Sequence, residues 1–471
     1  MAHWLRDRGF ETYAVRGGVA ALTGEGFEAE PVPGEEATPT RSRHVLAALH
    51  HPLFRRYSAG VLLSLIGNWV EAAAYGYVVL LLGGSAATLG LIGFLNTIPN
   101  LIFALPAGAL ADRYDRRKLL LIFQSLNMAL AATLAVTWAT GTLTIGLLGV
   151  LAVLGGILGT LSFAPFQAML AATVPRGDLE SAVAINSLSL QVARFVGPAI
   201  AGVLLAAAGP TWVFGVNAAS FVAVLGTLAL LPSSRTVQSA AVRGRGAISE
   251  GFRYVFGQRS LAAMMTLMLI AGLFGTPPVA FMIPALVRYN LHAGAGMLGA
   301  IMAAIGLGSL LGSIALLRLS RRPNKGEPLL LGLVITGAAV AGIGASTNAS
   351  LSLALAFVGG LAGVLFVGLS TVVVQAMSSD EFRARALAIW AAAFVGMLPF
   401  GALLTAGLTA VIGPGGAVFV DGVAVVIGTI VVIALRPQVA WLGCAALPQS
   451  CVAGLNPAAV ALEAEAQPST V

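Results

Sequence analysis

Glu71 lies inside a long apolar stretch, with Asn68 three positions before it and Tyr75 four positions after it. These spacings place the three side chains on one face of a helix. An ionisable group in apolar surroundings usually faces a cavity or a specific partner, because its burial is costly. The sequence therefore predicts that this face lines a cavity and that Glu71 is a proton-coupling residue. The alternative is a protonated glutamic acid that bonds to a neighbouring helix.

Arg194 and Asp421 are the other ionisable residues within apolar stretches. Arg194 follows Gln191 by one helical turn, and two roles are open for it: a cation that ties two helices together, or a group that handles substrate or protons. Asp421 lies near the expected start of the last apolar segment, where an acid is electrostatically favourable. We expect a structural role for Asp421.

The predicted cavity lining combines polar groups with aromatic rings, which could adapt to varied apolar ligands. Which side chains face the cavity depends on helix rotations. The predicted lining consists of Asn68, Glu71, Tyr75, Asn96, Gln191, Arg194, Trp390 and Phe394.

The stretch from Gly108 to Lys118 places six charges between two long apolar segments. Asp112 falls at the end of the first segment, where the helix dipole disfavours an acid, so it needs a partner. Basic residues of the stretch, or the positive end of a helix packed across Gly108, could supply one. A carboxylate held in only one of two arrangements would act as a conformational latch. The predicted latch consists of Gly108, Asp112, Arg113, Arg116 and Arg117.

The composition places the chain in a bilayer, since 58% of the 471 residues are hydrophobic, 10% are charged and the mean hydropathy is +0.91. A membrane-spanning helix needs about 20 apolar residues, and the alternation expected of a barrel is missing. We expect an all-α integral membrane protein with twelve spanning helices. They begin near Tyr57, Ala87, Leu119, Ile145, Ala182, Thr211, Leu261, Ala295, Leu329, Leu351, Ala386 and Gly416.

Arginine and lysine mark the cytoplasmic side of a membrane protein. With a cytoplasmic N-terminus, Arg288 is the only basic residue in an outer loop. Both termini are therefore expected in the cytoplasm, in a protein of the cell (inner) membrane. The net charge of +7 then faces anionic lipid, and we expect no nucleic-acid partner.

The segments repeat at an offset of about 204 residues, which predicts two pseudo-repeated six-helix bundles. The offset relates Gly108 to Gly312, Pro198 approximately to Pro399, and Asn217 to Asp421, whereas Leu316 stands where Asp112 would be repeated. The expected organisation is a disordered or over-called extension (1–50), an N-terminal bundle (51–231), a cytoplasmic linker (232–260), a C-terminal bundle (261–436) and a cytoplasmic tail (437–471).

Phosphate-binding and zinc-protease motifs are missing from the sequence, so we expect no enzymatic activity and no cofactor. The two cysteines, Cys444 and Cys451, fall in the predicted cytoplasmic tail, where thiols stay reduced. Neither a disulfide nor a metal site is expected. We expect a monomer whose partners are the bilayer, protons and a small molecule.

The run Gly108-Ala-Leu-Ala-Asp-Arg-Tyr-Asp-Arg-Arg117 resembles the signature between helices 2 and 3 of the major facilitator superfamily. Asp115 stands where many members have glycine, and the run Asp112-Arg-Tyr-Asp-Arg-Arg117 resembles the drug:proton antiporter branch that includes macrolide and enterobactin exporters. The run containing Gly197, Pro198 and Gly202 resembles the antiporter motif, although Ala201 replaces a glycine of that motif. The resemblance implies the major facilitator fold.

The resemblance further implies alternating access and proton-coupled efflux of hydrophobic drugs or a siderophore-like metabolite. An uncoupled lipid or metabolite carrier is one alternative. A membrane sensor or scaffold that keeps the fold without transporting is another.

Overall fold

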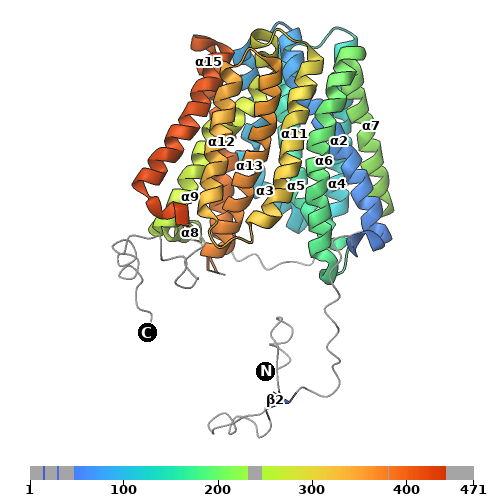
Figure 1. Cartoon of the computed structure of the whole chain (residues 1–471). Helices are drawn as coiled ribbons and strands as arrows, with labels where there is room; N and C mark the ends of the chain where they lie inside the picture. The colour runs from blue at the N-terminus through green and yellow to red at the C-terminus, as the bar shows by residue number, and fades with distance from the viewer. Residues whose placement is uncertain (1–13, 16–28, 31–46, 232–246, 380, 442–471) are drawn as a thin grey trace.

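The computed structural model of the chain describes residues 14–15, 29–30, 47–231, 247–379 and 381–441, which are almost entirely helical (Figure 1). The strands of the described part are β1 (Ala14–Val15) and β2 (Ala29–Glu30), which form an antiparallel pair. Both fall in the N-terminal extension. The remainder of 1–46 and the tail from 442, with both cysteines, lie outside the described residues.

The first six-helix bundle is preceded by a short 3-10 turn, η2 (Ala47–His50). Its helices connect through short turns, in which Ser85 and Thr144 cap the backbone at the starts of α3 and α5. The spanning helices are α2 (Pro52–Leu81), α3 (Ala86–Arg113), α4 (Arg116–Ala139), α5 (Ile145–Ala172), α6 (Leu179–Ala207), which follows η3 (Arg176–Asp178), and α7 (Pro210–Leu230).

The second bundle follows α8 (Ala247–Gly257) and begins with an irregular span. That span runs from α9 (Arg259–Ile270) through the π-helical turns η4 (Ala271–Gly275) and η5 (Pro278–Met282), then α10 (Ile283–Ala285) and η6 (Leu286–Asn290). The remaining elements are α11 (Ala295–Leu319), α12 (Gly326–Ala345), α13 (Ala349–Met377), α14 (Arg383–Phe394), η7 (Val395–Met397), α15 (Leu398–Leu435) and η8 (Pro437–Trp441).

Eleven helical stretches of the described chain are long and apolar enough to span a membrane, and the last of them, Arg383–Leu435, has 53 residues. That is more than twice the length of one span. The helix reverses at Gly413, whose φ of 75° lies in the left-handed region that favours glycine, and Pro414 follows. The stretch therefore crosses twice, and the twelve-helix prediction is confirmed.

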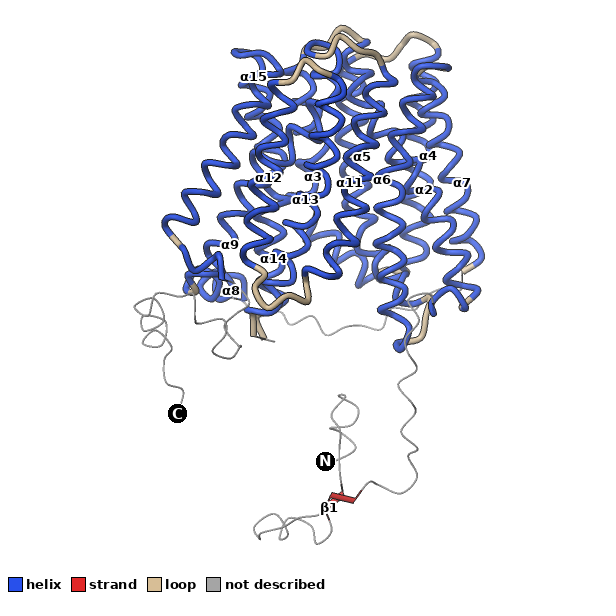
Figure 2. Tube along the Cα trace, in the orientation of Figure 1, coloured by secondary structure: helices blue, strands red, loops and turns tan. Residues whose placement is uncertain are grey.

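The start of α2 and the end of α15 lie on the same face of the molecule, which we call the terminal face (Figure 2). Two contacts at this face are related by the repeat. His51 Nε2 lies 2.7 Å from Asp178 Oδ2, which connects the start of α2 to α6. In the second half, Tyr254 of α8 stacks on Phe382 before α14, with ring centroids 4.3 Å apart. In each half, the start of the fifth spanning helix thus contacts a residue that lies just before the first spanning helix.

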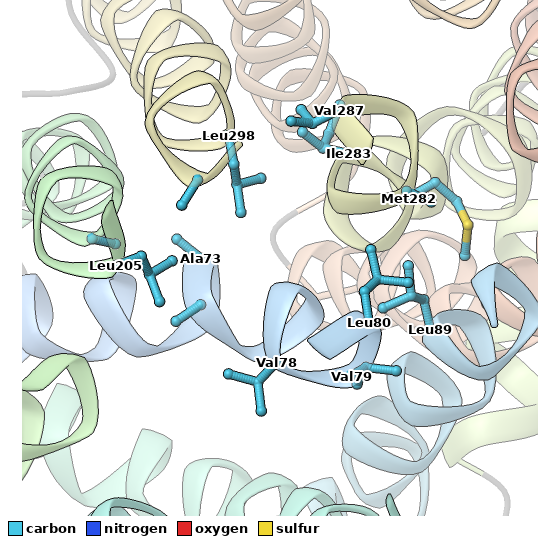
Figure 3. Close-up of a cluster of buried hydrophobic side chains, with 14 of the residues drawn as sticks. Ala73, Val78, Val79, Leu80, Leu89, Leu205, Met282, Ile283, Val287 and Leu298 are labelled. Carbon is cyan, nitrogen blue, oxygen red and sulfur yellow. The ribbon is translucent and has the colours of Figure 1, made fainter. Parts of the chain in front are cut away.

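The two bundles pack together at the opposite face through a cluster of buried apolar side chains (Figure 3). Arg288 reinforces this closure, because its guanidinium donates to Leu80 O at 2.8 Å and so satisfies a carbonyl at the end of α2. The cluster draws on α2, α3, α6, η5, α10, η6 and α11 and includes Val78, Val79, Leu80, Leu89, Leu205, Met282, Ile283, Val287 and Leu298.

Candidate functional site

A cavity of about 760 Å³ lies mainly within the first bundle. The second bundle contributes a largely apolar wall from residues 276–284 of the irregular span, which include η5, and from α11. The cavity volume suits a drug-sized ligand. The polar and charged lining includes Asn68, Glu71, Tyr75, Asn96, Gln124, Asn127, Gln167, Asn186, Arg194 and Asn217.

The cavity is accessible from the terminal face. The lining extends to Tyr57 near the start of α2 and to Phe166 and Gln167 near the end of α5. Gln167 and Asn68 are solvent-exposed although they line it. The buried apolar cluster closes the opposite face, so the cavity is accessible from one face only.

Glu71 is held by a residue that lies far away in the sequence. Asn217 of α7 donates its Nδ2 hydrogen to Glu71 Oε2 at 2.6 Å. Helix α7 approaches α2 closely at Gly67, where an added Cβ would collide with Asn217 and Ser220. The glycine therefore allows the amide to reach the carboxyl group of Glu71. Asn217 is only 2% exposed, so its orientation is fixed by packing.

Two further predicted residues line the cavity and connect it to α5. Tyr75 donates its hydroxyl hydrogen to Leu148 O at 2.9 Å. Asn96 of α3 donates to Ala152 O at 3.2 Å. Asn68, Glu71 and Tyr75 all belong to the lining, as their shared helix face predicts.

Arg194 enters the cavity from α6 and lies over an aromatic ring. Its Cζ is 4.9 Å from the centroid of Trp69, within the range of a cation–π interaction. Gly197 permits this arrangement, since a Cβ there would lie 2.5 Å from Trp69 Cβ. Arg194 Nε is buried and has no hydrogen-bond partner.

The segment that resembles the antiporter motif forms the contact between the halves. A Cβ on Gly202 would lie 2.7 Å from Gly299 Cα of α11, and a Cβ on Gly299 would lie 2.8 Å from Pro198 O. Such approaches need small residues on both helices. Gln191 strengthens the same contact, because its Nε2 donates to Ser313 Oγ at 2.7 Å. Gln191 lies at the α6–α11 contact and is not among the residues that line the cavity.

The predicted latch is only partly described. Arg117 donates to Leu228 O and Ala229 O at 2.8 and 2.7 Å, and so satisfies carbonyls at the end of α7. Asp115 caps α4 by accepting from Lys118 N at 3.1 Å. An added Cβ on Gly108 would meet no atom within 4 Å, so no helix packs across it in this conformation.

Within the described part of the chain, no ion pair involves Arg113 or Arg116. Arg113 is exposed, and Arg116 Nε is buried without a hydrogen-bond partner. The backbone of Asp112 belongs to the last turn of α3. Its side chain lies outside what the structure describes.

Three residues of interest in the second half lie away from the cavity lining. Trp390 donates from Nε1 to Ser370 Oγ at 3.1 Å and packs against Phe394. Asp421 is 0% exposed, and its Oδ2 accepts from Thr405 at 2.6 Å. Its Oδ1 has no hydrogen-bond partner.

Two residues at the centre of the site were not among the predicted set: Asn217 and Trp69. A signal existed for Asn217, because the repeat relates it to the in-span acid Asp421. We find none for Trp69. Among the described residues, no three His, Cys, Asp or Glu side chains gather in a way that could hold a metal ion.

The family described as transmembrane secretion effector matches residues 43–449. The multidrug efflux pump Tap of Mycolicibacterium fortuitum is 24% identical over 75% of this chain and 87% of its own length. The enterobactin exporter EntS of Citrobacter koseri is 26% identical over 80% of this chain and 90% of its own. The staphyloferrin A transporter of Staphylococcus aureus (strain NCTC 8325 / PS 47) is 34% identical, but the match covers 36% of this chain and 43% of that protein.

Solved structures share the fold at low sequence identity. A D-xylose–proton symporter has a TM-score of 0.64 and 16% identity, over 82% of this chain and 98% of its own. A bacterial homologue of the human lysosomal transporter Spinster, in an inward-facing and unoccupied conformation, has a TM-score of 0.60 and 14% identity, over 83% and 96%.

Proposed function

Because the chain belongs to the transmembrane secretion effector family of the major facilitator superfamily, we propose that it is a proton-coupled exporter of amphipathic small molecules that works by alternating access. The observation that supports this proposal is the cavity in the first bundle, walled on one side by the second bundle, which extends toward the terminal face and is closed at the opposite one. Rocking of two halves about such a site is the usual mechanism of transporters built from repeats.

The substrate proposal draws on the relatives. Tap is named as a multidrug efflux pump and EntS as an enterobactin exporter. The cavity of this chain combines apolar walls with amides and two charged groups, which suits either a drug or a siderophore-like metabolite. The relatives are transporters, and we propose no enzymatic activity for this chain.

Glu71 is our proposed proton carrier. Among the described residues it is the only carboxyl group in the cavity lining, and its contact with Asn217 places it between α2 and α7. A group that loads protons from alternate sides must lie in the alternating cavity, and Glu71 meets this requirement. Asp421 does not, since it is fully buried outside that lining.

We further propose that the terminal face is cytoplasmic and that the protein acts as a monomer in the inner membrane. Basic residues support this orientation, because Arg113, Arg117 and Arg385 all lie at the terminal face, whereas Arg288 lies at the opposite one. The short interfacial helix α8 lies at the same face, where its Phe252 and Phe256 are exposed.

Efflux from proteoliposomes tests the proposed function. The purified full chain is expected to move dansylamide, an uncharged aromatic probe, against its concentration gradient when a pH gradient is imposed, and to stop when a protonophore collapses that gradient. Movement that follows the concentration gradient of the probe alone would instead support an uncoupled carrier.

Orientation is checked with cysteines at Gly83 and Gly177, of which only the first should react with an impermeant thiol reagent from outside the cell.

We propose that Asp112 belongs to a latch that closes the terminal face by engaging the start of α14. The open space at Gly108 and the unpartnered Arg116 Nε fit a latch that is released in this conformation. Asp112→Asn is expected to favour the state open to the terminal face, because the variant loses a charge that the opposite conformation requires. Thiol labelling at Val79→Cys, from the opposite face, should fall.

Asp115→Asn is the matched control for the latch, since Asn also caps helices well and should preserve the start of α4. Unchanged labelling and unchanged efflux in Asp112→Asn would exclude the latch role.

A further inference from the structure

Arg194 brings a positive charge to the cavity wall, and the described residues supply no counter-ion for it. Its guanidinium lies over the ring of Trp69, and its Nε is buried without a hydrogen-bond partner. No ion pair in the described part of the chain involves it. A guanidinium stays protonated in proteins. A ligand in the cavity could therefore supply the counter-ion.

Glu71, the carboxyl group of the same lining, does not fill this role. Its Oε2 is bonded to Asn217 of α7, at 2.6 Å, and it makes no salt bridge with Arg194. The two charged groups of the described lining thus make separate contacts. Arg194 comes from α6, and Glu71 is held between α2 and α7.

Aromatic and amide groups share the cavity lining with the guanidinium. The lining includes the rings of Phe163, Phe166, Phe221 and Phe281, and rings are well suited to flat apolar groups. The amides of Asn68 and Asn186 add donors and acceptors without adding charge. This environment fits a ligand with an apolar or aromatic body and an acidic group at one end.

We propose that Arg194 and Trp69 form a subsite for the oxyanion of an aromatic amphiphile, such as a carboxylate or a sulfonate. This inference rests on the proposed export function and names the class of substrate. A planar guanidinium can bond an oxyanion through two parallel N–H groups. Trp69 lies against the guanidinium, with its ring centroid 4.9 Å from Cζ, so the ligand would bond the two terminal Nη groups rather than the buried Nε.

The subsite makes the cavity bind anionic ligands in preference to cationic ones. Arg194 offsets the repulsion that Glu71 would exert on an acidic ligand, so that an anion can enter a cavity that contains a carboxyl group. Export of an anion from a compartment that is negative inside is also favoured by the membrane potential.

Three fluorescent probes with one aromatic body and different charges test the subsite: dansylglycine, a carboxylate; dansylamide, neutral; and dansylcadaverine, a cation. Fluorescence titration of the purified full chain in nanodiscs is expected to show dansylglycine binding at least about tenfold tighter than dansylcadaverine. Arg194→Gln should remove this preference. Arg194→Lys should keep part of it, because it retains the charge but loses the two-pronged geometry.

A second pair of variants tests the charge without changing Arg194. Ile305 lines the cavity beside Gly306, which packs on the Arg194 backbone. Ile305→Glu adds a carboxylate to the cavity lining, on the helix that packs against the Arg194 backbone, and should abolish the preference for dansylglycine, whereas Ile305→Gln should retain it. This pair keeps the test valid where Arg194→Gln fails to fold.

Equal binding of all three probes to the parental protein, or a preference that survives both Arg194→Gln and Ile305→Glu, would overturn the subsite and leave Arg194 as a structural cation. These outcomes differ from failure of the proposed function. A protein that selects dansylglycine in the titration but moves no substrate uphill would have the subsite without proton-coupled export. Proton-driven efflux by a protein that binds the three probes equally would support the proposed function without the subsite.

Discussion

Glu71→Gln is expected to abolish uphill efflux driven by a pH gradient while the protein still folds and binds ligand. Glutamine has the shape of the protonated glutamic acid and can still accept from Asn217, so the α2–α7 contact should persist. It cannot release a proton. Transport that depends on alternating protonation should therefore fall at least about a hundredfold, to the leak of empty liposomes, if proton transfer at this site is obligatory.

Exchange of labelled for unlabelled substrate across the same liposomes separates coupling from folding. Exchange needs the cavity to alternate but needs no net proton movement, so Glu71→Gln should retain it. Glu327→Gln, an identical chemical change at an exposed position in the first turn of α12, should leave uphill efflux unchanged. If Glu71→Gln concentrated substrate at the parental rate, Glu71 would be a structural residue, and Asp112 would become the next candidate.

Gly299→Val is expected to prevent closure of the opposite face and so to arrest the transport cycle. A Cβ on Gly299 would lie 2.5 Å from Gly202 Cα, 2.8 Å from Pro198 O and 3.0 Å from Gly202 N. All three are atoms of the α6 backbone, which cannot move aside as the end of a side chain could. Overpacking of this kind costs about 1–3 kcal/mol, which corresponds to a shift of about five- to 150-fold between the two conformations.

The shift can be measured by labelling a cysteine placed at Val79, in a protein whose two native cysteines are replaced by serine. Val79 lines the cavity and is 0% exposed in the closed cluster (Figure 3). Gly299→Val should make it reactive from the opposite face. Gly296→Val is the matched control on the same helix, since a Cβ there meets no atom within 4 Å. Equal labelling of the two variants would show that the Gly202–Gly299 contact does not control closure.

The sequence by itself determined the class of protein and the course of the chain. Apolar stretches of spanning length cannot remain in water, and the backbone within a bilayer must satisfy its own hydrogen bonds, so helices were the only solution. The turn at Gly413 was also predictable, because Gly-Pro-Gly-Gly separates the last two apolar stretches. The shared face of Asn68, Glu71 and Tyr75 followed from helical spacing alone.

Only the tertiary structure decided which groups meet. Asn217 reaches Glu71, which is 146 residues away in the sequence, because Gly67 lets α7 approach α2. Trp69 lies under Arg194 because Gly197 leaves room for it.

The same physics explains why Trp390 and Phe394 lie outside the cavity lining, although the sequence suggested them for it. Apolar residues cover nearly the whole surface of each helix, so hydrophobic periodicity does not specify which face turns inward. Helix rotation in this protein is instead set by close contacts at small residues, such as Gly202 on Gly299, and those contacts exist only once two distant segments are packed together.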